Sequence, residues 1–148
     1  MSARLFGKLP AHGDFVARGL SFAERDALDA WLSASLSAAR ETYGDAFEER
    51  FDTAVPWQCE GEGVAGAIAA SQDAAGRRYP VLLLCAGEPQ AAARCEDLLY
   101  AAIGEGWSAD RLAAETGPAP TGTASLWRQG TRERTGAEPA DLLTAMLA

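Results

Sequence analysis

The residues best suited to chemistry gather in the stretch GKLPAHGDFVARGL, residues 7–20. It holds the only histidine of the chain, His12, together with Lys8 and Asp14. A Ser-His-Asp triad or a Cys-His pair would have to use His12 as its base. The chain has no G-x-S-x-G sequence to expose a nucleophilic serine. We therefore expect a loop that serves recognition, and the alternative is a small hydrolase using His12 with Asp14 or a cysteine.

Other chemistries find less support. Cys59, Cys85 and Cys95 stand 26 and 10 residues apart, and an odd count without a CxxC pair argues against a disulfide framework. We expect buried, reduced thiols. One histidine and scattered cysteines do not give the ligand spacing of a zinc site, and Gly7-Lys8 does not match the G-x-x-x-x-G-K-[ST] phosphate loop. We expect no metal and no cofactor.

A second polar segment, SQDAAGRRYP, occupies residues 71–80. Asp73 and Gly76 are typical of a turn between two strands, and Arg77 and Arg78 follow at once. An arginine fork paired with Asp14 or Asp73 would hold the loop at residues 10–14. We predict Asp14 as the partner of Arg77 or Arg78, and the alternative is a solvated hairpin tip.

The composition limits the possible partners. The chain has 148 residues, of which 48% are hydrophobic and 23% charged, as in an ordinary globular domain. A net charge of −8 repels phosphates and anionic lipids, so nucleic acid is excluded and a neutral or basic protein partner is favoured. Neither an apolar leader at the N-terminus nor an apolar run of about 20 residues is present. We expect a cytoplasmic protein without direct membrane insertion.

The hydrophobic pattern predicts the elements that position these loops. S-x-x-E at 21–24 forms a capping box, and apolar residues at spacings of three and four predict a helix over 21–43 whose face toward the sheet carries Leu28, Trp31, Leu32, Leu36 and Tyr43. Strands are predicted at 3–7, 54–60, 63–71, 79–87 and 123–130, and further helices at 89–104, 108–117 and 138–148. The fold class is α/β, a single domain with a mainly antiparallel central sheet of about five strands and helices packed on it.

The two polar motifs also carry a resemblance. GKLPAHGDFV and SQDAAGRRYP, with LDAWL at 28–32, AVPW at 54–57 and SLW at 125–127, stand in the order found in the TagF family of type VI secretion-associated proteins. The chain resembles that family over nearly its whole length, which implies a single TagF-like domain over residues 1–148. His12 occupies a variable position of the motif, which weakens a catalytic role for it.

The resemblance implies a cytoplasmic accessory protein, not an enzyme, that represses type VI secretion after translation through protein–protein contacts. The implied partner is a forkhead-associated-domain scaffold, and the alternative role is a structural subunit of the secretion apparatus. Some family members carry a fused phosphatase domain, and we expect any such activity to come from a separate chain. The motif positions implied as the interaction surface are Gly7, Lys8, Leu9, Pro10, Gly13, Asp14, Phe15, Ser71, Asp73, Gly76, Arg77, Arg78, Tyr79 and Pro80.

Overall fold

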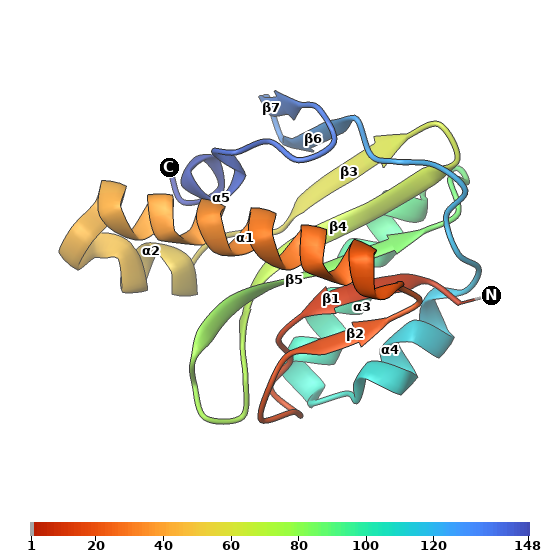
Figure 1. Ribbon diagram of the computed structural model, residues 1–148, viewed down its shortest axis with the longest axis horizontal. Helices are drawn as coiled ribbons and strands as arrows, with labels where there is room; N and C mark the ends of the chain where they lie inside the picture. Colours follow the sequence, from red (N-terminus) through yellow and green to blue (C-terminus); the bar gives the residue numbers. More distant parts are fainter. Residues whose placement is uncertain (1) are drawn as a thin grey trace.

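The computed structural model describes residues 2–148 and has three layers, with one sheet between two layers of helices (Figure 1). The strands are β1 (Arg4–Gly7), β2 (Val16–Arg18), β3 (Trp57–Gly61), β4 (Val64–Gln72), β5 (Arg78–Cys85), β6 (Leu126–Gln129) and β7 (Arg132–Thr135). They form one antiparallel sheet in the order β2-β1-β5-β4-β3-β6-β7. The predicted α/β class and antiparallel sheet are confirmed, with seven strands instead of about five.

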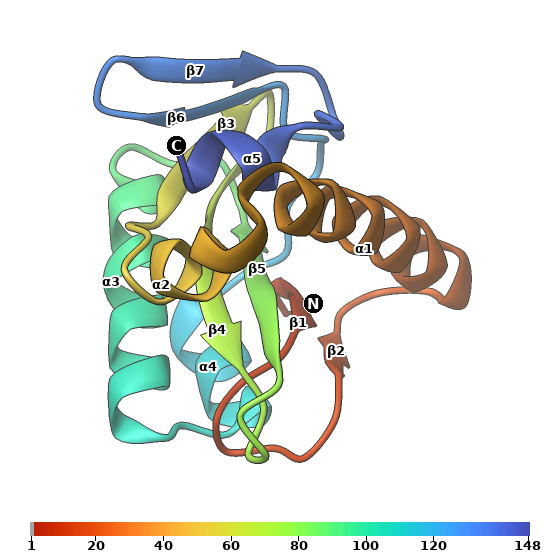
Figure 2. The ribbon, with the colours of Figure 1, turned by 90° about the vertical axis from the view of Figure 1, so that its left-hand side faces the viewer.

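Five α-helices and one short 3-10 helix cover the two faces of the sheet in the described residues. They are α1 (Phe22–Tyr43), η1 (Gly44–Ala46), α2 (Phe47–Asp52), α3 (Ala91–Glu105), α4 (Ala109–Thr116) and α5 (Leu142–Met146). Figure 2 shows α1, α2 and α5 on one face of the sheet and α3 and α4 on the other. The capping box that predicted the start of α1 is present, because Ser21 Oγ accepts from Glu24 N and Glu24 Oε1 accepts from Ser21 N.

The core beneath α1 is built around aromatic side chains. Trp31 lies against Trp127 with ring centroids 5.4 Å apart, and its indole N–H donates to the Pro139 carbonyl. Leu142 and Leu143 of α5 are fully buried in the same cluster. The carboxyl end of the chain is therefore part of this core.

The opposite face uses small residues. Ala65, Ala67 and Ala69 of β4 are buried and pack in the same cluster as Cys95 and Leu99 of α3. Side chains this small let a helix approach the strand closely. This accounts for the apolar, alanine-rich pattern of the strand predicted at 63–71.

The two unpredicted strands, β2 and β7, are the edges of the sheet. β2 has three residues, too few for a periodic pattern to be recognised. β7 has the sequence RERT and no fully buried residue, so it lacks the hydrophobic signal of a strand. Short and charged edges of this kind are common, because they discourage pairing with other molecules.

Among residues 2–148, no helix has both the length and the apolar character needed to cross a membrane.

We expect Trp31→Ala to lower the free energy of unfolding by about 3–5 kcal/mol, because it removes a buried aromatic side chain and leaves a cavity. Denaturant unfolding measures this change. Phe22→Ala is the matched control on the same helix: Phe22 is 84% exposed, and its replacement should change stability by less than about 0.5 kcal/mol. Equal effects of the two substitutions would contradict the placement of Trp31 in the core.

Candidate functional site

The two predicted motifs meet because β1 and β5 are neighbours in the sheet. Gly7 lies opposite Val81, and the Lys8 N–H donates to the Pro80 carbonyl at 3.3 Å. Gly7 has a φ of +138°, and a Cβ there would lie 2.1 Å from the Pro80 oxygen. Only glycine lets the strand pass this carbonyl.

An ion pair joins the two motifs. Lys8 Nζ lies 3.2 Å from Asp73 Oδ2, with side-chain exposures of 10% and 0%. Asp73 Oδ1 accepts from the backbone N–H groups of Ala75 and Arg77, and Oδ2 accepts from Arg77 Nε. Burial alone would raise the pKa of the Asp73 carboxyl, but hydrogen bonds from the Arg77 backbone, Lys8, the Ala75 backbone and the Arg77 side chain outweigh it and lower the pKa to about 2.

Aromatic rings surround the same lysine. Lys8 Nζ lies 4.8 Å from the ring centroid of Phe15 and 5.9 Å from that of Tyr79, and these two rings meet edge to face at 4.8 Å. The faces of such rings attract a cation. The Tyr79 hydroxyl lies 2.9 Å from Ser33 Oγ of α1, and burial raises its pKa to about 12. Tyr79 is therefore a neutral link between the motifs and α1.

The predicted pairing of Asp14 with an arginine is wrong. Asp14 is exposed, and its Oδ1 accepts from the N–H of the next residue, Phe15. Arg77 instead binds Asp73 and donates to the Gly13 carbonyl at 2.8 Å, so the alternative partner, Asp73, is the correct one. Arg78 pairs with Asp52 and Glu48 of α2. The Asp14 carboxylate binds a backbone N–H of its own turn. Asp73 and Arg77 pair because they lie four residues apart in one hairpin.

Half of the predicted surface residues are buried. Gly7, Lys8, Leu9, Ser71, Asp73, Tyr79 and Pro80 lie inside the fold, Pro10, Phe15 and Arg78 are half-buried, and Gly13, Asp14, Gly76 and Arg77 are exposed. The Ala74 N–H donates to the His12 carbonyl at 2.7 Å, which ties the loop to the hairpin. The motifs thus form a rigid frame that presents a small exposed tip, defined here as Gly13, Asp14, Gly76 and Arg77.

His12 has a structural partner that the sequence did not reveal. Its Nε2 accepts from the backbone N–H of Ala109, the first residue of α4, at 2.9 Å. Within residues 2–148, the His12 side chain makes no hydrogen bond to a carboxylate, hydroxyl or thiol. The nitrogen that would act as a base is occupied by a helix N–H, which disfavours the hydrolase alternative.

The three cysteines are free and buried, as predicted. Cys85 and Cys95 lie with their sulfurs 3.3 Å apart. The hydrogen bond from Cys95 lowers the pKa of the Cys85 thiol to about 7, with a further contribution from Arg94. Burial raises the pKa of Cys59. In the described part of the chain, no three His, Cys, Asp or Glu side chains are grouped to hold a metal ion.

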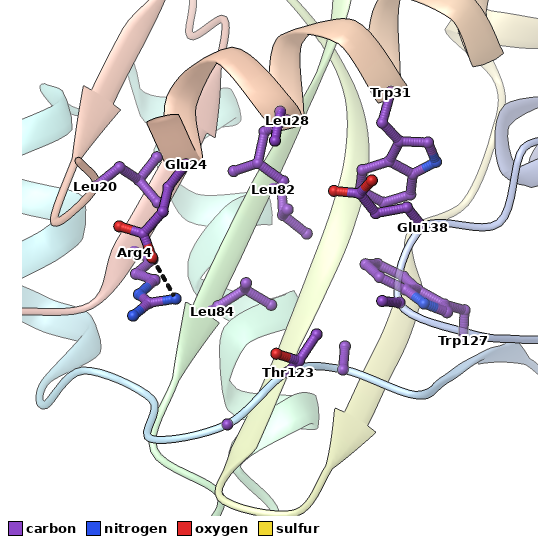
Figure 3. Close-up of a pocket in the computed structure, with 14 residues that line it drawn as sticks. Arg4, Leu20, Glu24, Leu28, Trp31, Leu82, Leu84, Thr123, Trp127 and Glu138 are labelled. Carbon is purple, nitrogen blue, oxygen red and sulfur yellow. Dashed lines mark ion pairs between the residues drawn. The ribbon is translucent and has the colours of Figure 1, made fainter. Parts of the chain in front are cut away.

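A cavity of about 180 Å³ lies between α1, the sheet and the segment 122–138 (Figure 3). Its walls include Leu28, Trp31, Leu84 and Trp127, and the ion pair between Arg4 and Glu24, at 3.1 Å, lies at one end. Both tryptophan N–H groups are used, by the carbonyls of Pro139 and Gly136. The helical pattern predicts Trp31 as a residue that faces the sheet but does not predict the path of 122–138, so the sequence misses this cavity.

Comparison with known proteins adds a family and a fold. The model of the family described as "TagF N-terminal domain, Type VI secretion system-associated" matches residues 4–116. The crystal structure of PA0076 from Pseudomonas aeruginosa PAO1 superposes with a TM-score of 0.69 at 24% sequence identity, over 99% of this chain and 76% of that one. At this identity the likeness shows a shared fold. None of the curated proteins matches the chain.

We expect Asp73→Asn to be less stable than the wild type at pH 7 and to lose this difference in acid. The native pKa of about 2 lies below the value of about 3.9 for an unfolded chain. The carboxylate therefore stabilises the fold above about pH 4, and this contribution is lost as the pH falls toward 2. Thermal melts between pH 2 and 7 measure it, with Asp26→Asn on the exposed side of α1 as the control. A wild-type–variant difference that stays constant over this range would contradict the assignment.

We expect His12→Ala to lower the free energy of unfolding by about 0.5–1.5 kcal/mol, the net contribution of one hydrogen bond. Amide hydrogen exchange gives a specific measurement. Exchange at the Ala109 N–H should be faster in the variant, because the substitution removes the acceptor of that N–H. His12→Gln, whose side-chain oxygen is also an acceptor, is the matched variant. Unchanged exchange at Ala109 in His12→Ala would contradict the role given to the imidazole.

Proposed function

The chain belongs to the TagF N-terminal domain family of type VI secretion-associated proteins, and on that premise we propose that it represses type VI secretion after translation. It acts by binding another protein component of the system and not by catalysis. The observation that carries this proposal is the rigid frame of the two motifs, which fixes the exposed tip against the sheet through the Lys8–Asp73 pair.

The chemistry of the tip suits protein recognition. Asp14 and Arg77 present one charge of each sign, and Gly13 and Gly76 leave the backbone between them accessible. Because the loop is tied to the hairpin by the Arg77–Gly13 and Ala74–His12 hydrogen bonds, little conformational freedom remains to be lost on binding. Preorganised surfaces of this kind bind with a smaller entropic cost.

We propose a forkhead-associated-domain scaffold of the secretion system as the partner, as the resemblance to the family implies. The net charge of −8 favours a partner surface that is neutral or basic. We also propose that the protein is cytoplasmic, because it would bind the scaffold in that compartment.

Two other roles make different demands. A small hydrolase needs a free base, and the Nε2 of His12 accepts from Ala109. A structural subunit of the apparatus would be needed for secretion, whereas a repressor would restrain it. The direction of the change on deletion separates these two roles.

We expect deletion of the gene to increase the amount of secreted protein in the culture medium, and the wild-type gene to restore the lower level. Quantitative immunoblotting of medium and cells measures the change, with cell lysis monitored by a non-secreted protein. Abolished secretion would instead show a structural subunit.

We expect Asp14→Arg to weaken binding to the forkhead-associated-domain scaffold by about tenfold or more, because a reversed charge at an interface loses a favourable contact and adds repulsion. Asp26→Arg, the same change on the exposed side of α1, is the control and should bind as the wild type does. Purified proteins and calorimetry measure both, and melting curves confirm that each variant is folded. Equal binding by both variants would place the interface elsewhere.

A further inference from the structure

β4 is longer than its neighbour β3 and leaves part of one edge open. The pairing of these strands begins at Gly61 opposite Val64 and ends at Trp57 opposite Ile68, while β4 continues to Gln72. Before Trp57 the chain turns away into α2, and Figure 2 shows β4 extending beyond the reach of β3. Among residues 2–148, β5 is the only strand that pairs with the last four residues of β4.

The backbone groups on the open side can be assigned from the neighbouring strand. Pro80, opposite Ala70, has no N–H, and its carbonyl accepts from Lys8 on the far side. The Asp73 N–H donates to Arg77 across the hairpin. Because backbone groups alternate in direction along a strand, the N–H and C=O groups of Ala70 and Gln72 point to the open side. None of these four groups has a strand partner within residues 2–148.

The open edge lies at the bottom of a groove. A hollow of about 350 Å³ is lined by Ala70, Ser71 and Gln72 of β4, by Phe51 and Ala54 from α2 and the turn after it, and by Pro10 and Ile103. Figure 2 shows α2 and α3 on opposite faces of the sheet. Phe51 belongs to the core cluster on the α1 face and Ile103 packs against the cluster on the α3 face, so they line the groove from opposite sides.

Ser71 provides a second, independent observation. Ser71 is 6% exposed and lines the groove. Its hydroxyl has no hydrogen-bond partner among the described residues. A buried hydroxyl without a partner costs free energy. A polar group of a ligand in the groove would satisfy it once the side chains that cover the hydroxyl move aside.

The charged side chains around the groove indicate the sign of the charge that a ligand would carry. Asp52 at its rim and Glu48 share one arginine, Arg78. The excess of carboxylates favours a segment with basic side chains.

We propose that this groove binds an extended basic segment of a partner protein, which adds to β4 as a short strand in line with β3. The backbone of the segment would pair with Ala70 and Gln72, and its side chains would contact Ala54 and Ile103. In such recognition, main-chain hydrogen bonds supply affinity and side-chain pockets supply specificity. The inference concerns the groove alone and does not depend on repression or on the identity of the scaffold.

The test uses the full chain and a phage-displayed library of random linear octapeptides as the probe. Ala54→Trp fills the groove, and Ala34→Trp places the same bulk at an exposed position of α1 as the matched control. Gln72→Pro removes one edge N–H, and Gln72→Ala keeps it. Should the proline variant fail to fold, the Ala54→Trp and Ala34→Trp pair still decides the question.

The expected result is enrichment of peptides with Lys or Arg on the wild type, with binding about tenfold or more weaker to Ala54→Trp and Gln72→Pro and within about twofold for the two controls. A synthetic peptide of the enriched sequence should slow amide exchange at Ala70 and Gln72. No enrichment over Ala54→Trp, or protection of other amides, would overturn the proposal. A wild-type dimer that Ala54→Trp abolishes would also overturn it, because the occupant would then be a second copy of the chain.

Discussion

The buried pair of Lys8 and Asp73 sets the arrangement of everything around it. Removing two charges from water is costly, and the cost is offset only when the remaining hydrogen-bonding capacity of both groups is satisfied. Here the carboxylate also accepts from Ala75 and Arg77, and the ammonium lies against the rings of Phe15 and Tyr79. These contacts stabilise one another, so they favour a single arrangement of the end of β1 and the β4–β5 hairpin. The exposed tip is held in place by the same contacts.

Sequence patterns correctly predicted the helices and strands that have local signals. They did not predict which side chains from distant parts of the chain lie close together. The capping box at Ser21 and the apolar periodicity defined α1, and the continuous apolar run defined β5. The sequence offers two carboxylates and two arginines for one ion pair, and spacing alone did not select between them. Asp73 pairs with Arg77 because both belong to one hairpin, whereas Asp14 is used by the N–H of Phe15.

The remaining features depend on where elements end in space. His12 meets Ala109 only because the loop after β1 reaches the start of α4, a contact between residues far apart in the chain. The open edge of β4 exists because α2 ends at Asp52 and the chain joins β3 only at Trp57. Neither distance can be read from hydrophobic periodicity.

The family match ends at Thr116, yet the core beneath α1 includes Trp127 and the buried leucines of α5. Three segments also hold the last turns from outside, through Tyr43, Arg50 and Arg132, which donate to carbonyls of residues 144–148. During synthesis, the apolar face of α1 is therefore not fully covered until α5 has been made. Folding governed by such distant contacts is slow, and a nascent chain without residues 142–147 leaves this apolar face of α1 partly uncovered.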